Sequence, residues 1–509
     1  MTRLAWLGLA LLLASAHAAS AEPLVYCGDQ EGGGPYIYPS PDDPHTVIGT
    51  DVDIAAALAR HLGREARFQQ GQWDRLPDLL GARKCDVVIN GYERTPSRVA
   101  TMAASLPYQV YGLAFLVRKD RDPTFGLETL KGEGRFHVGA LTGSSAEAWL
   151  RANVGPNVVI ATYDGNTDAM REVETKKLDG TLQDTPIATF YAPRFPELEA
   201  RGEPVGHGYY VVYARSDDRA LIEGIDHALL EMIQSGELRA ILHRYGVWDA
   251  PQKELLEIAA HAPLFGVVTA TVALVESSSV ASASPLGARP RGLFEVARRY
   301  GAILIESAGL TVLLSVISFP IAVLLGLMIA VGRIWGPRVL AVPLTLYVEV
   351  LRGTPLMLQL YFVFFFLPEL GVNIPAFGTA ILGLAVNYSA YESEIYRAGL
   401  QAVPRGQMEA ALSLGLSRSQ ALSRVVIPQA FRSVIPPVMN DFIALFKDTS
   451  VCSVVTLIEL TKRFSVLSQS TQATIELMVL TALLYLAMSW PASKAARMLE
   501  HRLGVETRG

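Results

Sequence analysis

Long apolar segments after residue 300 constrain this chain more than any other feature. About 20 consecutive apolar residues cross a bilayer as a helix, and residues 308–331 carry no charged side chain. Charged residues make up 18% of the chain, but they are dense between about 20 and 260 and sparse between 300 and 490. We therefore expect an exported soluble half and an all-α membrane half. Five segments are predicted to span, the second starting as early as 339 and the fourth being the least apolar: 308–331, 353–368, 375–391, 434–458 and 474–490.

The first 21 residues have the composition of a secretory signal. Arg3 precedes an apolar run over residues 4–13, and small residues then lead to Glu22. The apolar core is too short to span a membrane. Cleavage is plausible after Ala18 or after Ala21. The soluble half is therefore predicted to be exported.

Basic residues agree with five crossings that begin outside and end in the cytoplasm. The loop between residues 369 and 374 has no basic residue, and cytoplasmic loops are enriched in Lys and Arg. A sixth span at 263–275 would reverse every loop, so we expect a tether or a surface helix there. The predicted cytoplasmic side carries Arg397, Arg405, Arg418, Arg424, Arg432, Lys494, Arg497 and Arg502.

The exported half alternates short β-rich runs with helical ones. "LVYCGD", "CDVVING", "FHVGAL" and "GYYVVYARS" are typical of strands, and "DVDIAAALARHLG" is typical of a helix. This alternation predicts an α/β domain with parallel sheets, in which ligands bind at the carboxyl ends of strands. The pattern is lost after residue 250. The predicted organisation is a signal peptide (1–21), an exported α/β domain (22–250), a linker (251–298) and a membrane domain (299–509).

Two of the three cysteines lie in the exported half, where a disulfide can persist. Cys27 is expected near the end of one strand and Cys85 near the start of another. If the two strands are parallel neighbours, this offset holds the cysteines too far apart to bond. We therefore expect no bridge.

The stretch "QMEAALSLGLSRSQALSRVVIP" interrupts the apolar half with charges and hydroxyls. It predicts an amphipathic helix, a turn at Gly415 and a second helix that ends at Pro428. A DNA-binding helix-turn-helix has similar spacing, but a loop between two spans leaves no room for such a domain, and a net charge of −5 does not favour nucleic acid. A plain surface hairpin is the simpler alternative.

The order of Glu409, Ala410, Ala411 and Gly415 in this stretch resembles the coupling loop of bacterial ABC-transporter importer permeases. "LRGTPLMLQLYF", "NYSAYESEIYRAGLQAVPRGQMEAA" and "FKDTSVCSVV" extend the likeness to the polar amino-acid branch, over roughly 300–500. The resemblance implies that this loop docks into a cytoplasmic ATPase homodimer, and that a second permease half completes the pore, by homodimerisation or with a paralogue. No phosphate-binding loop with its lysine occurs in the chain. ATP and Mg²⁺ are therefore expected on the partner, with no cofactor in this chain.

Four polar residues fall within the predicted fourth span: Asn440, Asp441, Lys447 and Asp448. Charges at membrane depth are costly and usually face the bundle interior or a water-filled path. Asp441 and Asp448 are seven positions apart and would share a helix face. They are expected either to line the translocation path or to pair structurally with Lys447 and neighbouring helices.

The exported half resembles the periplasmic amino-acid-binding (type II solute-binding) proteins over most of residues 24–248. The motifs are "GPYIY", "GTDVDIAAALA", "CDVVINGYERTPSRVATMAASLPY", "VGALTGSSAEAWL" and "LQDTPIATFYA". Such proteins have two α/β lobes, joined by hinge strands, that close on a ligand. The resemblance implies that Arg98 and Ser145 grip an α-carboxylate and that Asp184 receives the α-ammonium, a pairing that suits a zwitterion.

Neighbouring residues complete the predicted ligand site. Gly91 and Ser144 lie within the same motifs, and Tyr36 and Trp73 are expected either to wall the side-chain pocket or to belong to the core. Glu93 departs from the family, which usually has a hydroxyl residue there. Its carboxylate would repel that of a ligand unless it pairs with Arg94 or Arg98, or faces a cationic side chain.

Together these features predict the membrane subunit of an ABC importer in a bacterial inner membrane. A polar amino acid, or a related small solute, would be captured by the periplasmic domain, and the C-terminus would lie in the cytoplasm. A ligand-sensing receptor is the alternative, although no output domain follows the last span. An enzyme is disfavoured, because no catalytic triad or metal cluster stands out in the exported half.

Overall fold

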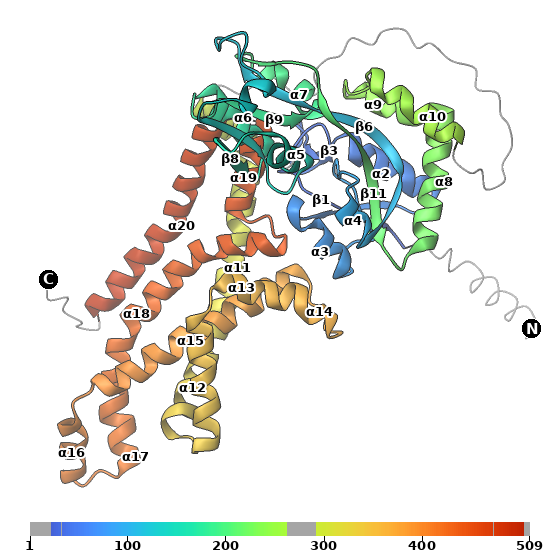
Figure 1. Cartoon of the computed structure of the whole chain (residues 1–509). Coiled ribbons are helices and arrows are strands. Elements are labelled where there is room, and N and C mark those ends of the chain that lie inside the picture. Colours follow the sequence, from blue (N-terminus) through green and yellow to red (C-terminus); the bar gives the residue numbers. More distant parts are fainter. Residues whose placement is uncertain (1–21, 32, 262–291, 472, 503–509) are drawn as a thin grey trace, which may run out of the picture. The chain divides into compact units, whose positions relative to one another are not determined.

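The computed structural model describes residues 22–31, 33–261, 292–471 and 473–502 (Figure 1). These residues form two compact units that divide between positions 288 and 289. The predicted signal (1–21) and the apolar stretch 263–275 lie outside the described residues. Each unit has a separate hydrophobic core, so the two are described one at a time.

The first unit is built on a nine-stranded sheet in the order β4-β1-β5-β11-β6-β9-β7-β8, with β10 paired to β6. Two parts of this sheet are parallel. In one, β1 lies between β4 and β5, and in the other, β7 lies between β8 and β9. The bounds are β1 Leu24–Gly28, β4 Ala66–Gln70, β5 Val87–Val88, β6 Met102–Arg118, β7 Phe136–Leu141, β8 Val158–Tyr163, β9 Gly180–Asp184, β10 Leu198–Ala200 and β11 Val205–Arg215. A separate ribbon pairs β2 Tyr38–Pro39 with β3 Val47–Ile48.

Two long antiparallel strands, β6 and β11, connect the two parallel parts. β11 pairs with β5 at its C-terminal end, and β6 pairs with β9. The parallel pairing predicted for the α/β domain is present in both parts, and the antiparallel pair of β6 and β11 lies between them. These two strands join a lobe that contains β1, β4 and β5 to a lobe that contains β7, β8 and β9, and the domain is thus two-lobed.

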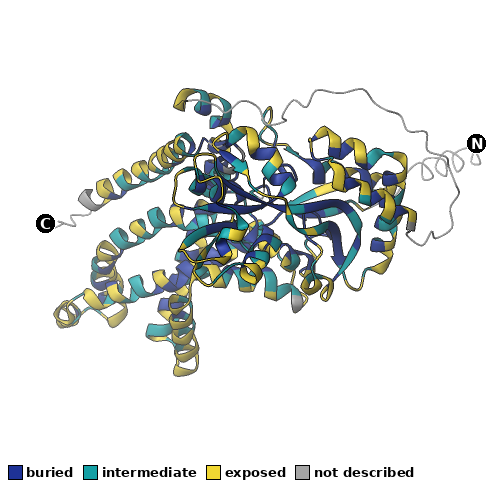
Figure 2. Cartoon of the chain, turned by 45° about the horizontal axis from the view of Figure 1, so that its top comes forward, coloured by how far each residue is buried: buried dark blue, intermediate teal, exposed yellow. Residues whose placement is uncertain are grey.

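Helices cover the sheet of the first unit, and their apolar faces form its core (Figure 2). In α8, the buried residues Ile225, Leu229 and Met232 recur at helical spacing, and the helix ends at Gly236 with φ 79°. The helices are α2 Thr50–His61, α3 Leu76–Gly81, α4 Pro96–Val99, α5 Ser145–Asn153, α6 Asn166–Glu174, α7 Thr185–Tyr191, α8 Arg219–Ser235 and α9 Glu237–Arg244, with 3₁₀ turns η1 Trp73–Arg75, η2 Leu127–Lys131 and η3 Ala192–Arg194.

The first unit extends beyond the predicted boundary at residue 250. A 3₁₀ turn (η4, Ala250–Lys253) leads into α10 (Glu254–His261), and both belong to the stretch predicted as linker. The side chain of Gln252 donates to the carbonyl of Val110 in β6 and accepts from its N–H, and Leu255 is buried. The linker prediction thus fails for 251–261, because these residues add to the core rather than leave it.

Cys27 and Cys85 form a disulfide, with their Cα atoms 5.8 Å apart. This corrects the expectation that strand offset would keep them separate. β5 begins only at Val87, so Cys85 precedes the strand and is not held to its register with β1. The connection that follows α3 brings it against Cys27.

The second unit is helical in every regular element that the structure describes. Its helices are α11 Leu293–Trp335, α12 Arg338–Gly353, α13 Leu356–Tyr361, α14 Leu367–Glu369, α15 Ala376–Ala402, α16 Arg405–Ser413, α17 Arg418–Ala421, α18 Ile427–Asp448, α19 Leu460–Thr471 and α20 Thr474–Arg502. Two π turns (η5 Phe362–Phe366 and η6 Leu422–Val426) and a 3₁₀ turn (η7 Thr449–Val455) link them. α11, α19 and α20 pack around a core that includes Tyr300, Leu304, Leu467 and Leu477.

The five-span count is not confirmed. Among the described residues, α11 and residues 474–499 are long and apolar enough to cross a membrane. A third span results if α12 and residues 356–366, which are bent by 110° relative to each other, count as one. The other two predicted segments are helical, as α15 and α18, but polar residues such as Asn387 and Asp441 lower their hydropathy.

Candidate ligand-binding site, membrane cavity and coupling loop

A small pocket lies between the two lobes of the first unit. Its free volume is about 10 Å³, which is room for about one water molecule. The lobes are therefore closed on each other with no space for a ligand as large as an amino acid. The lining residues are Tyr36, Trp73, Asn90, Gly91 and Glu93 from one lobe, and Leu141, Ser144, Ala146, Asn166, Leu182, Gln183, Asp184 and Ile187 from the other.

Asp184 ends β9 and begins α7, which places its carboxylate at the carboxyl end of a strand. It is 8% exposed and accepts a hydrogen bond from the hydroxyl of Tyr210. Burial, followed by the nearby charge of Glu93, raises the pKa of Asp184 to about 8. No Lys, Arg or His of the described residues forms an ion pair with it. Asp184 is thus a buried acid without a cationic partner.

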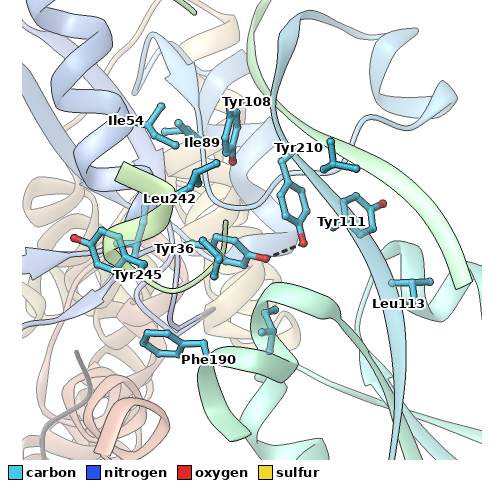
Figure 3. Packing of buried hydrophobic residues seen from close by; sticks show 14 of the residues in the cluster. Tyr36, Ile54, Ile89, Tyr108, Tyr111, Leu113, Phe190, Tyr210, Leu242 and Tyr245 are labelled. Atoms are coloured by element: carbon cyan, nitrogen blue, oxygen red, sulfur yellow. Dashed lines mark hydrogen bonds between the residues drawn. The ribbon is translucent and has the colours of Figure 1, made fainter. Parts of the chain in front are cut away.

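Tyr210 reaches the pocket from β11 and was not predicted from the sequence. The hydroxyl of Tyr36 donates to that of Tyr210 at 2.7 Å, and the ring of Tyr111 stacks on Tyr210 at 4.5 Å (Figure 3). A chain of hydrogen bonds thus runs from Tyr36 in one lobe, through Tyr210, to Asp184 in the other lobe. In the sequence, Tyr210 is one tyrosine of an alternating strand, and nothing local distinguishes it.

Glu93, Arg98 and Ser145 form a second polar cluster at the edge of the pocket. The guanidinium of Arg98 donates to the Glu93 carboxylate at 2.5 Å and lies 3.9 Å from the centre of the Tyr92 ring. The other oxygen of Glu93 accepts the backbone N–H of Ser145 at 2.9 Å. Of the pairings considered from the sequence, the one with Arg98 is present. Glu93 is 1% exposed, and its carboxylate bridges the two lobes.

The two serines of "TGSS" hold the start of α5. Ser144 caps the helix, accepting from the N–H of Glu147 and donating to the carbonyl of Leu141. The hydroxyl of Ser145 accepts a hydrogen bond from Tyr111 at 2.9 Å. Both hydroxyls are therefore already engaged in the closed domain.

Gly91 supports the aromatic wall of the pocket. Its φ is +57°, and a Cβ there would come within 2.7 Å of the Tyr36 ring, so glycine is required. Its N–H donates to Asp51 at 2.6 Å, and burial raises the pKa of Asp51 to about 6. The indole of Trp73 donates to the carbonyl of Asn90 at 3.2 Å. Tyr36 and Trp73 belong to both the wall and the core.

Asn90, like Tyr210, was missed by the sequence analysis. Its side-chain oxygen accepts the N–H of Asp29, but its side-chain NH₂, although buried, has no partner among the described residues. A buried unpaired donor that lines a pocket is free for a ligand acceptor. The only local signal was its position before Gly91 at the end of a predicted strand.

The second unit contains a larger cavity of about 550 Å³. Asp441 and Asp448 line it from one face of α18, and the hydroxyl of Tyr388 donates to Asp448 at 2.7 Å. Asn440 and Lys447 are exposed and do not line it. The structure thus brings together two of the four predicted pathway residues. The full lining is Arg352, Gly353, Thr354, Pro355, Leu356, Asn387, Tyr388, Tyr391, Asp441, Ala444 and Asp448.

The predicted helix-turn-helix is present between α15 and α18. α16 carries Glu409 and Ala410 exposed and Ala411 buried, and the turn follows at Gly415 with φ +84°. The second helix does not end at Pro428, as predicted. It continues through a π turn into α18, so the proline sits near the start of that helix. The backbone N–H that proline lacks is a small loss there, because the hydrogen-bond pattern of a helix is already irregular at a π turn.

Two protein families account for most of the chain. Residues 27–247 match the bacterial extracellular solute-binding proteins, family 3, and residues 322–505 match the binding-protein-dependent transport system inner membrane component. A probable amino-acid ABC transporter permease protein of Sinorhizobium fredii is 38% identical over 187 residues, 37% of this chain and 81% of that protein. A probable glutamine ABC transporter permease protein of Bacillus subtilis is 38% identical over 38% of this chain and 89% of that protein.

Solved structures are similar to part of this chain. A structure described as an amino acid ABC transporter with histidines is 35% identical and covers 42% of this chain and 99% of that chain, with a TM-score of 0.40. Holo ArgBP from T. maritima is 26% identical over 44% of this chain and 95% of that chain, with a TM-score of 0.39. The protein is thus a binding-protein–permease fusion, a transporter component. It belongs to the amino-acid ABC transporter permease family and carries a family 3 solute-binding domain in the same polypeptide.

Proposed function

We propose that this chain is an importer subunit that captures an amino acid or a related small solute in its first unit and moves it across the inner membrane through its second. One observation carries this conclusion: a two-lobed binding domain and an amino-acid permease domain occur in one polypeptide. A solute released from the first unit is therefore always near its own permease.

The ligand must be inferred from the pocket rather than from the permease relatives. Relatives with similar identity to this chain are named for different solutes, such as L-cystine, glutamine and arginine. The first unit is the part that selects. Arg98, Asp184 and Ser145 are proposed to govern capture, with Tyr36 and Trp73 forming the wall and Gly91, Glu93 and Ser144 completing the site.

Five spans are proposed for the second unit, with the first unit in the periplasm and the C-terminus in the cytoplasm. Many positions along the helices of the second unit are exposed (Figure 2), and large apolar side chains among them support a lipid-facing surface. The basic residues of the α15–α18 connection favour the cytoplasm for that loop. The exposed apolar residues include Ile305, Leu324, Met328, Val339, Leu346, Ile475, Met478 and Leu486.

The coupling loop is proposed to dock into a cytoplasmic ATPase homodimer that binds ATP and Mg²⁺. Glu409 and Ala410 are exposed on α16, and Leu414, next to the Gly415 turn, is 84% exposed. An exposed leucine at a fixed turn suits a groove on a partner protein. A second permease half, most simply another copy of this chain, would complete the pore.

Asp441 and Asp448 are proposed to line the translocation path. Both acids face the 550 Å³ cavity, whose lining also includes the polar residues Asn387 and Tyr388, so a polar solute would meet hydrogen-bonding groups there. Asn440 and Lys447 are proposed to act outside this cavity.

Uptake separates an importer from a sensor. Proteoliposomes with the full-length chain and its partner ABC ATPase would be tested for ATP-dependent accumulation of radiolabelled amino acids and amines. An importer accumulates at least one solute, and omission of the ATPase abolishes it. Ligand binding without accumulation would instead favour the receptor alternative.

A further inference from the structure

In the pocket of the first unit, the carboxylate of Glu93 accepts from the hydrogen-bond donors that would otherwise bind the carboxylate of a ligand. The Arg98 guanidinium and the Ser145 N–H both donate to Glu93, across the two lobes. Glu93 is 1% exposed, and its backbone is held in place: its carbonyl accepts from the Tyr213 hydroxyl, and the N–H of Arg94 next to it donates to the carbonyl of Tyr209. The strongest anion-binding donors at this site are therefore already used by the protein.

The acidic residues at the pocket outnumber the basic ones. The acidic residues that line the pocket are Glu93 and Asp184, and Arg98 beside them forms its ion pair with Glu93. Asp184 keeps only the hydrogen bond from Tyr210. A cationic ligand would give Asp184 the partner that Arg98 gives Glu93. A ligand carboxylate would instead add a third acidic group to a buried pocket. The unpaired NH₂ of Asn90 suits a neutral acceptor and is a weak counterweight to that repulsion.

We propose that the site selects amines that lack an α-carboxylate, with Glu93 occupying in cis the position of the missing group and Asp184 pairing with the ammonium. Decarboxylated relatives of the basic amino acids have this chemistry. The inference rests on the proposed capture role of the first unit and names its substrate class. The lobes must open to admit such a ligand, because the closed pocket has room for about one water molecule.

Matched pairs of probes isolate the carboxylate. Calorimetry of the full-length chain in nanodiscs would compare agmatine with arginine, and cadaverine with lysine, because each pair differs by a single carboxylate. Each amine is expected to bind at least tenfold more tightly than its amino acid. If either amino acid binds as tightly as its amine, or more tightly, the inference is overturned and the importer function stands. If no probe binds, the inference fails, and the uptake assay with other amino acids then decides the capture role of the first unit.

Substitution of Glu93 tests the cause of the preference. Glu93→Gln keeps the size but frees the Arg98 charge, so the ratio of amine to amino-acid affinity should fall at least tenfold. Glu199→Gln is the matched control, because Glu199 pairs with Arg201 away from the pocket and should leave the ratio unchanged. A ratio that Glu93→Gln does not move would overturn the assignment to Glu93. If this variant does not fold, the wild-type comparison still decides the question.

Discussion

Asp184→Asn should stabilise the ligand-free protein while abolishing capture. Burial raises the pKa of Asp184 from 3.8 to about 8, so at pH 7 the folded protein holds a proton that the unfolded chain has released. One pKa unit corresponds to about 1.4 kcal/mol, and the interval from 3.8 to 7 gives an upper limit of roughly 4 kcal/mol. Asparagine needs no proton and can still accept from Tyr210. We expect a gain of about 2–4 kcal/mol in the free energy of unfolding at pH 7.

The sign of the pH dependence is fixed by the direction of the shift. A raised pKa means that the contribution of Asp184 is most favourable below pH 3.8 and is lost as the pH rises towards 8. The advantage of Asp184→Asn should therefore be almost absent at pH 4 and grow up to about pH 8.

Thermal unfolding of the full-length chain, followed by intrinsic tryptophan fluorescence, measures this difference. A gain of 1 kcal/mol corresponds to roughly 2–4 °C for a unit of this size. Asp217→Asn is the matched control, because Asp217 is exposed and pairs with Arg83 at the surface. A variant less stable than the wild type at pH 7, or an advantage equal at pH 4 and pH 7, would refute the reasoning.

Three other outcomes are expected. Arg98→Ala should lower the free energy of unfolding of the first unit by roughly 3–5 kcal/mol, because it leaves Glu93 buried without its cation; an unchanged melting temperature would contradict this. Gly415→Val should leave capture intact but reduce ATP-dependent uptake and co-purification of the ATPase, because a β-branched residue at φ +84° is strained by roughly 1–3 kcal/mol; wild-type uptake would reduce the loop to a surface hairpin. Replacing Cys27 and Cys85 by serine should destabilise the first unit by roughly 4 kcal/mol, from the 58-residue loop that the disulfide closes, and an unchanged melting temperature would argue against it.

Features that depend on neighbours in the chain were predictable from the sequence. Gly415 stands between two amphipathic runs, and its positive φ follows from the turn that they require. The strand "FHVGAL" corresponds to β7 residue for residue. The two families were recognisable because their motifs occur in order along the chain. Helix periodicity and turn chemistry act over a few residues, so the sequence carries them directly.

Contacts between distant residues were decided only by the tertiary structure. Cys85 bonds Cys27 because it precedes β5 and is not held to the register of that strand. Tyr210 reaches Asp184 because β11 crosses between the lobes. The sequence marked Glu93 as unusual, but only the fold showed that its carboxylate joins Arg98 to the N–H of Ser145. Such pairings depend on register, strand length and lobe closure, which arise when the whole core packs. No local stretch of residues encodes them.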